Sequence, residues 1–219
     1  MTTRLEIPIL TLTDMVLFPR TLLSLRITEP SQRQLVEAAL EREGEIGVIL
    51  LQPGWGWDSA EKPKVFQIGG MGVIVDYQAP AVDEIEVIVQ GLHRFVVEEH
   101  LQVRPYRTAR VRLLNENIPL GPDTRKVSRL LVRYFNEVAK AADSHSVSLS
   151  GLKKLDYHTL VNSICAWLNF SVYEKQRLLE LEDVCKRGEE VLRILKSHVL
   201  DVRLISRFRH LQPEDARFN

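Results

Sequence analysis

The chain is short of cysteine and carries no excess charge of either sign. Only Cys165 and Cys185 occur among its 219 residues, which excludes a disulfide-rich scaffold and predicts free, buried thiols in a reducing compartment. Lysine plus arginine equals aspartate plus glutamate, at 29 each. The chain as a whole therefore has no general attraction for nucleic acid or for an anionic membrane.

Long apolar runs are missing as well, and the longest are far shorter than the ~20 residues that span a bilayer. The N-terminus does not look like a secretory signal, because Pro8 and Asp14 interrupt its apolar stretch. A hydrophobic fraction of 45% is nevertheless ordinary for a globular protein, so a real core is expected. We predict a cytoplasmic protein with no membrane contact.

Motifs for nucleotide, metal and nucleophile chemistry are scarce. No G-x-x-x-x-G-K-[ST] sequence provides a cradle for nucleotide phosphates. His93 and His100 have no partner at metal-ligand spacing, so neither a metal nor another cofactor is expected. The segment from Ser150 to Lys153 fits S-x-x-K but lacks the companion motifs of that chemistry, and the start of a helix is the simpler interpretation.

Short apolar runs and alternating residues occupy the chain from residue 5 to about residue 114. They predict roughly seven strands, enough for a small barrel or sandwich. The runs are residues 7–12, 22–27, 46–51, 65–68 with 71–75, 85–89, 95–97 and 109–114. Glycines in the fourth run indicate a bulge or a close backbone approach. One helix interrupts the strands, with Thr28 as its cap, Pro30 in its first turn and Gly44 at its end.

Beyond Asn115 the apolar period changes to three and four, which predicts helices. Ser171 and Glu174 form a capping-box pattern, and the last helix is expected to run toward Phe208. The loop at residues 117–123 has the composition of a boundary. We therefore predict two domains, a barrel with one inserted helix at 1–116 and a helical bundle at 117–219.

Several short motifs stand out along the chain. The opening stretch, residues 7–30, has two apolar runs around the corner Val16-Leu-Phe-Pro19. Four more follow: Gln67-Ile-Gly-Gly-Met-Gly-Val-Ile, a G-x-x-R-F match at Gly91, Arg94 and Phe95, Pro105-Tyr106 with Ala109-Arg-Val111, and Lys175-Gln-Arg-Leu-Leu-Glu180. In their residues and in their order, these motifs resemble the N-terminal domain of Lon proteases. The chain departs from the family at Arg20, where glycine is usual, and at Ser31, where arginine is usual.

The resemblance implies an α+β fold, a pseudouridine-synthase-like (PUA-like) β-barrel followed by a C-terminal α-helical bundle. It also implies a substrate-binding role in protein quality control, with unfolded or damaged polypeptides as partners and a protease as a further candidate partner. The ATPase and the serine–lysine peptidase of Lon proteases belong to later modules. We therefore expect a free-standing, non-enzymatic module.

Peptide recognition requires an apolar groove or an open strand edge, and the junction of barrel and bundle is the natural place for either. We expect Arg20, Arg94 and Tyr106 to rim it. Trp55 and Trp57, in a glycine-containing loop, would bury much apolar area against a partner, although they could instead fold back onto the barrel.

The alternative hypothesis is an RNA-binding or other interaction domain, because the barrel resembles an RNA-associated fold. Four arginines would supply phosphate contacts: Arg104, Arg107, Arg110 and Arg112. The neutral total charge and the lack of a row of aromatic side chains for stacking count against it. Polypeptide is therefore the expected partner, and nucleic acid is not.

Overall fold

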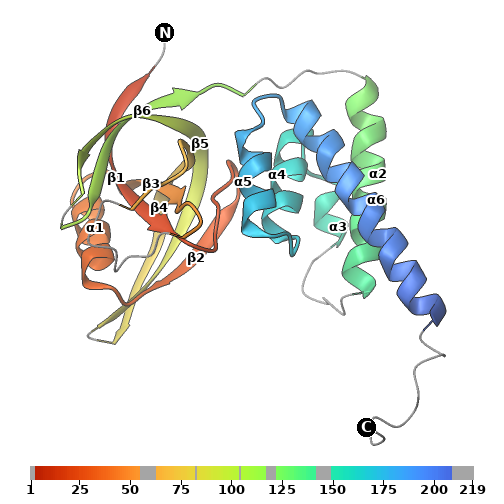
Figure 1. Cartoon of the computed structure of the whole chain (residues 1–219), viewed down its shortest axis with the longest axis horizontal. Coiled ribbons are helices and arrows are strands. Elements are labelled where there is room, and N and C mark those ends of the chain that lie inside the picture. The colour runs from red at the N-terminus through yellow and green to blue at the C-terminus, as the bar shows by residue number, and fades with distance from the viewer. Residues whose placement is uncertain are drawn as a thin grey trace, which may run out of the picture.

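A computed structural model describes residues 3–54, 63–81, 83–103, 105–116, 122–141 and 149–208. In this part of the chain a β-barrel lies beside a bundle of helices (Figure 1). The strands are β1 (Arg4–Leu12), β2 (Leu22–Ile27), β3 (Glu45–Leu50), β4 (Ile68–Ala81), β5 (Glu84–Gln102) and β6 (Arg107–Leu114). Their order is β2-β5-β4-β3-β1-β6, and a β5–β6 pairing closes the barrel. The predicted α+β architecture is confirmed.

The strand count differs from the prediction because β5 is one strand of 19 residues. Sequence patterning divided it at Gly91, where the alternation of polar and apolar residues is interrupted. Its first half pairs with β2, its second half pairs with β6, and β4 pairs along both halves. The described residues therefore contain six strands, and β5 supplies the wall that they share.

The glycines of β4 and β5 let another part of the backbone come close. A side-chain carbon at Gly70 would collide with the carbonyl oxygen of Leu17, and one at Gly91 would collide with that of Phe18. The corner predicted around Phe18 therefore crosses directly over both strands, and the predicted close approach is confirmed.

One helix packs on the barrel, on the side away from the bundle (Figure 1). This is α1 (Pro30–Leu40), whose Leu35, Val36 and Ala39 are buried. Pro30 is in the first turn as predicted, but the N-cap is Glu29 rather than Thr28, and it makes no side-chain capping bond. Gly44 follows with a positive φ of 73°, a conformation that suits glycine, and its N–H donates to the Ala39 carbonyl oxygen.

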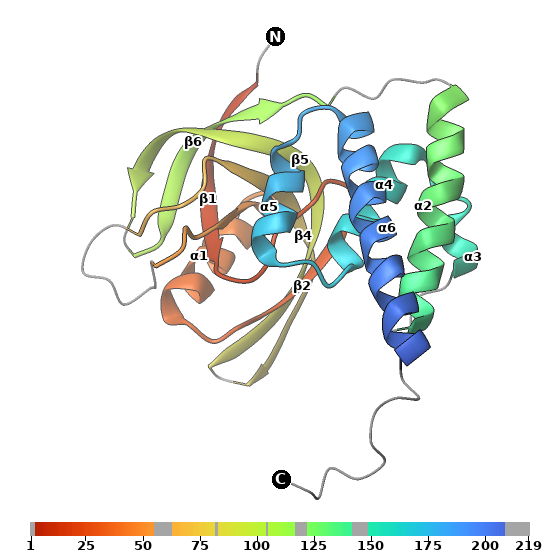
Figure 2. The same cartoon turned by 45° about the vertical axis from the view of Figure 1, so that its right-hand side comes forward.

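Helices make up the rest of the described chain: α2 (Pro122–Ala141), α3 (Leu149–Leu152), α4 (Tyr157–Trp167), α5 (Val172–Glu180) and α6 (Val184–Phe208). The long helices α2 and α6 lie side by side, and α5 stands between α6 and the barrel (Figure 2). The capping box of Ser171 and Glu174 is present as predicted. No helix of the described residues is both long enough and apolar enough to cross a membrane.

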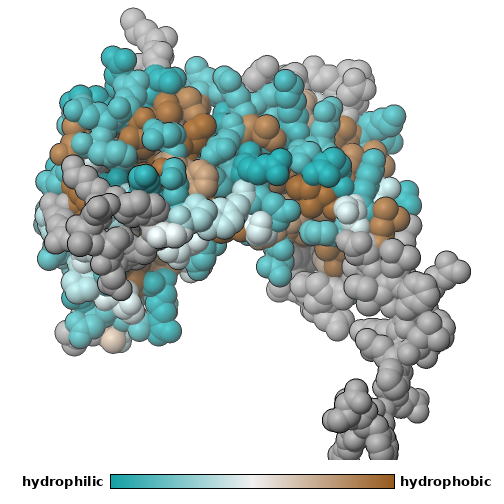
Figure 3. Space-filling model, in the orientation of Figure 1, coloured by the Kyte–Doolittle hydropathy of each residue, from teal (hydrophilic) through white to brown (hydrophobic). Residues whose placement is uncertain are grey.

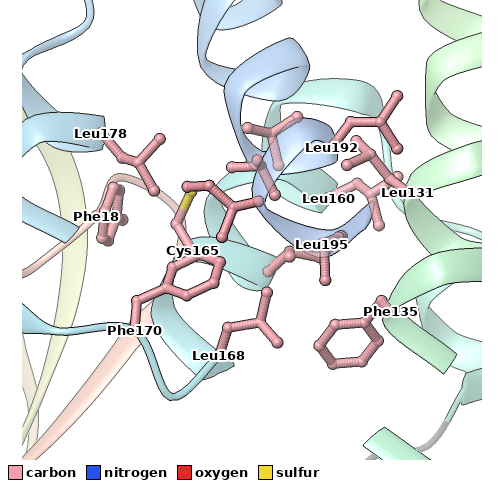
Figure 4. Packing of buried hydrophobic residues seen from close by; sticks show 14 of the residues in the cluster. Phe18, Leu131, Phe135, Leu160, Cys165, Leu168, Phe170, Leu178, Leu192 and Leu195 are labelled. Carbon is pink, nitrogen blue, oxygen red and sulfur yellow. The ribbon is translucent and has the colours of Figure 1, made fainter. Parts of the chain in front are cut away.

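A shared apolar core joins barrel and bundle. Val16, Phe18 and Leu50 come from the barrel, yet they belong to the cluster that α2, α4, α5 and α6 build. Figure 4 shows Phe18 facing Leu178 of α5, with Cys165 of α4 nearby. Cys165 is free and fully buried, and burial raises its thiol pKa to about 12. Strand gives way to helix between β6 and α2, while the division into two domains at residue 116 stays a prediction.

Candidate functional site

One edge of β2 is unpaired in the described structure. β2 pairs with β5 along its whole length, and no described strand pairs with its other side. It runs along the flank of the barrel that borders the bundle (Figures 1 and 2). An open edge of this kind presents a row of backbone donors and acceptors to a further strand.

The register identifies the residues whose backbone faces outward. The N–H of Gly91 donates to the Thr21 carbonyl oxygen, and the Gly91 carbonyl oxygen accepts from the Arg20 N–H, so the polar groups of Gly91 face β2. Because backbone direction alternates along an antiparallel ladder, residues 85, 87 and 89 of β5 also face β2. It follows that Leu22, Ser24 and Arg26 direct their N–H and C=O groups away from β5.

Apolar side chains lie at the end of β2 nearest the bundle. Leu22 is 65% exposed and Leu92 of β5 is 37% exposed, so both present apolar surface to the solvent. Leu22 is paired with Gln90, so Leu92 lies one step along the same outer face. Figure 3 shows that the molecule is hollowed on this side, between the lower end of the barrel and the bundle. The β2 edge therefore combines open backbone groups with apolar side chains beside a concave surface.

Arg20 fixes the turn that leads into β2. It has a positive φ of 63°, which costs a non-glycine residue about 1–2 kcal/mol. Its N–H donates to the Gly91 carbonyl oxygen at 2.7 Å. Its guanidinium donates to the Asp156 carboxylate at 3.1 Å and to the Thr159 hydroxyl at 3.4 Å. These contacts hold an arginine where the Lon-like pattern has glycine, and they tie the turn to the start of α4.

This strain gives a testable order of stabilities. We expect Arg20→Gly to be more stable than Arg20→Ala by about 1 kcal/mol, because glycine adopts a positive φ without a steric penalty. Both variants lose the same exposed ion pair, which by itself is worth about 0–1 kcal/mol. Urea denaturation of the two proteins measures the difference. Equal stabilities, or a more stable alanine variant, would contradict the assignment of strain.

A second feature of the junction is a buried cluster of charges around Glu116. Its carboxylate lies 3.1 Å from Arg94 Nε and 2.7 Å from Arg187 Nη1, and it also contacts His158 Nε2. The side chains of Arg94 and Arg187 are fully buried. Arg94 comes from β5, Arg187 from α6 and His158 from α4, while Glu116 follows β6. One carboxylate therefore binds barrel and bundle together.

Backbone carbonyl groups accept further hydrogen bonds from the two arginines of this cluster. Arg94 donates to the Leu179 carbonyl oxygen at 2.9 Å, and Arg187 donates to those of Leu178 and Leu181. Burial by itself would raise the pKa of Glu116, but the hydrogen bond from His158 and the charge of Arg187 outweigh it and lower that pKa to about 2. The carboxylate is thus held ionised inside the junction.

The residues expected to rim one peptide-binding groove lie in different environments in the structure. Arg20 is exposed beside β2, but Arg94 is buried inside the junction and does not rim an open groove, because its guanidinium is used by Glu116 and by backbone carbonyls. Tyr106 is partly buried against the barrel cluster that also packs on α1. Trp55 and Trp57 lie outside the described residues.

The basic stretch of the rival hypothesis is largely neutralised. Arg107 is buried and donates to the Pro63 carbonyl oxygen, Arg110 pairs with Glu6 and Glu99, and Arg112 pairs with Glu98. Arg104 is outside the described residues. Cations already paired with carboxylates attract phosphate weakly, so this face offers little to a nucleic acid.

Among the described residues, no group of histidine, cysteine and carboxylate side chains is arranged to hold a metal. Of the acidic residues at the β4–β5 turn, Glu84 pairs with Arg26 and Asp83 pairs with Arg33. These carboxylates serve in surface ion pairs, and their arrangement does not suggest acid–base chemistry.

Comparison with known proteins identifies the family. The model of the "ATP-dependent protease La (LON) substrate-binding domain" matches residues 6–197. The chain belongs to this family. Two solved structures of Lon N-terminal domains share the fold of this chain. The N-terminal domain of Mycobacterium avium complex Lon protease matches with a TM-score of 0.65 and 18% identity, covering 90% of this chain and 98% of that one. The Lon N-terminal domain protein from Xanthomonas campestris matches with a TM-score of 0.62, also at 18% identity, covering 86% and 98%.

Curated relatives are longer than this chain. Lon protease of Dictyoglomus thermophilum is 27% identical over 190 residues, which cover 84% of this chain and 23% of the relative. Lon protease of Parabacteroides distasonis is 28% identical over 195 residues, which cover 86% and 23%. The chain thus spans about a quarter of the length of these relatives.

The β2 edge and the charge cluster were both missed at the level of sequence. Residues 22–27 were predicted as a strand, but whether a strand is at an edge depends on pairings that its own residues do not encode. Arg187 had a usable signal, since it occupies the apolar stripe of α6 together with Val184 and Val191. A charge on a buried stripe indicates a buried partner.

Proposed function

We propose that this member of the Lon substrate-binding family binds unfolded polypeptide as an extended strand along the open edge of β2. The observation that carries the proposal is the outward-facing backbone of Leu22, Ser24 and Arg26 beside the exposed side chains of Leu22 and Leu92. Backbone hydrogen bonds do not depend on the sequence of the bound chain, and this suits a protein that must accept many clients.

The charges around the edge support the same interpretation. Arg26 pairs with Glu84, and Arg20 pairs with Asp156, so the cations nearest β2 already have carboxylate partners. The apolar end of the edge, at Leu22 and Leu92, then favours an aliphatic or aromatic side chain on the client. Damaged and unfolded proteins expose such side chains together with unpaired backbone.

The wider role follows from the family. We propose a cytoplasmic, non-enzymatic module of protein quality control, acting alone or delivering clients to a protease. Trp55 and Trp57 remain candidates for additional peptide contacts, and Arg20 contributes by fixing the turn that opens β2.

A proline at the edge gives the sharpest test. We expect Ser24→Pro to weaken binding of a carboxymethylated, permanently unfolded polypeptide about tenfold, because it removes an outward N–H and places a ring where the client strand would lie. The β2–β5 ladder keeps its own hydrogen bonds, since the Ser24 N–H does not face β5. Fluorescence anisotropy with a labelled polypeptide measures the affinity.

Ser24→Ala is the matched control, because it keeps the N–H and should bind as the native protein does. Circular dichroism of both variants checks that the barrel remains folded. Equal affinities of the proline and alanine variants would remove the β2 edge from the binding site. Absence of binding by the native protein would overturn the proposed function as a whole.

A further inference from the structure

A separate pocket of about 350 Å³ lies between α5 and α6. Both helices face the viewer in Figure 2. Its wall is held by buried Arg187, which donates to the carbonyl oxygens of Leu178 and Leu181 at 2.9 Å and 2.6 Å. The end of α5 and the turn into α6 are thus fixed, so the pocket is a built feature of the bundle.

The floor of the pocket is apolar. Leu178, Leu181 and Ile194 line it. Lys186 lies in the first turn of α6 and Ile194 lies further along the same helix, a separation of about 12 Å at ~1.5 Å per residue. A chain at ~3.3 Å per residue covers that length with about four extended residues.

The rim carries more positive than negative charge. Arg177, Lys186 and Arg193 line the pocket together with Glu174 and Glu190. Both carboxylates already accept hydrogen bonds from other groups of the protein. Glu190 forms a bidentate pair with Arg193 at 2.9 Å and 2.7 Å, and Glu174 accepts from the backbone and hydroxyl of Ser171 in the capping box.

Lys186 and Arg177 are the cations left over. Neither side chain forms an ion pair within the part of the chain that the structure describes, and the backbone N–H of Lys186 is capped by Asp183. An ammonium group beside an apolar floor is complementary to a ligand that carries a carboxylate next to an apolar group.

We propose that this pocket binds the C-terminal end of a polypeptide, with the terminal carboxylate bound by Lys186 and Arg177 and apolar side chains on Leu178, Leu181 and Ile194. The inference rests on the proposed function for polypeptide as the ligand, but it assigns a second site away from β2. A volume near the lower end of the ~300–1,000 Å³ range of ligand pockets suits a chain end.

The test uses N-acetyl-Gly-Ala-Leu-Leu with a free carboxylate, the same peptide as its C-terminal amide, and a peptide of equal charge in which an internal glutamate replaces the terminal carboxylate. Isothermal titration calorimetry measures binding to the native protein, to Lys186→Gln and to Lys154→Gln. Lys154 is an exposed lysine that does not line the pocket, so it is the matched control.

We expect the free carboxylate peptide to bind about tenfold more tightly than the amide and more tightly than the glutamate peptide. Lys186→Gln should weaken it about fivefold, with Lys154→Gln unchanged, and added salt should weaken it further. Equal binding of acid and amide, no effect of Lys186→Gln, or no binding at all would overturn the proposal. Equal binding of the glutamate peptide would overturn the assignment to a chain end.

Ser24→Pro separates this inference from the proposed function. If the pocket is a second site, this variant loses affinity for the long unfolded polypeptide and keeps its affinity for the short free-carboxylate peptide. Loss of both affinities would place the short peptide on β2 and overturn the pocket assignment. Native binding of the long polypeptide combined with no binding of the short peptide would reject the pocket alone.

Discussion

Replacing Glu116 by glutamine is expected to lower the free energy of unfolding by about 3–5 kcal/mol, the usual cost of removing one partner from a buried ion pair. The carboxylate is the acceptor shared by Arg94 and Arg187, whose side chains are fully buried. Glutamine keeps the size of the side chain but leaves two guanidinium groups without a counter-charge. Guanidinium chloride denaturation, followed by circular dichroism, measures the loss.

Glu99→Gln is the matched control. Glu99 pairs with Arg110 at the protein surface, and both side chains are about half exposed. Such pairs contribute about 0–1 kcal/mol, so this variant should unfold almost as the native protein does. If Glu116→Gln were equally mild, the cluster around Glu116 would have no role in joining barrel and bundle.

Acid should remove the difference in the free energy of unfolding between Glu116→Gln and the native protein. The pKa of Glu116 is lowered from 4.5 to about 2 in the folded protein. A lowered carboxyl pKa stabilises the folded state above the unfolded pKa, and this stabilisation is lost as the pH falls through the folded value. The gap in stability should therefore be full above about pH 4.5 and shrink toward pH 2, whereas a gap that is constant across this range would contradict the ionised state of Glu116.

Strand and helix patterning identified the elements but not their partners. The barrel strands, the close approach at the β4 glycines and the capping box of Ser171 followed from local spacing and from residue type. Arg94 was expected on the rim of a groove at the junction of barrel and bundle, yet a buried position of a strand can hold an arginine if a carboxylate and carbonyl groups meet it. Those partners come from Glu116 and from α5, far away in sequence.

The buried position of Glu116 could not be predicted from local sequence either. It follows a strand and precedes a loop rich in proline and glycine, a context typical of an exposed connection. Periodicity carries no information about a residue between two elements. Only the meeting of side chains from β5, α4 and α6 makes this position the centre of the junction. The free edge of β2 is likewise a property of the sheet order and not of residues 22–27.

Phe18→Ala should lower the free energy of unfolding by about 3–5 kcal/mol, the usual range for removing a fully buried phenylalanine. Phe18 is part of the barrel corner that packs into the bundle (Figure 4). Its removal leaves a cavity between the two parts of the molecule, so barrel and bundle should both lose stability.

Two probes can test whether barrel and bundle share that core. Trp167 lies at the end of α4 and contributes to the fluorescence signal, while circular dichroism reports on all the strands and helices. We expect the two unfolding curves to coincide in the native protein and in Phe18→Ala, since Phe18 contributes to both parts. Tyr77→Ala, at an exposed aromatic residue of β4, is the control and should cost less than about 1 kcal/mol. A Phe18→Ala protein whose fluorescence changes well before its circular dichroism would show that the bundle unfolds independently of the barrel.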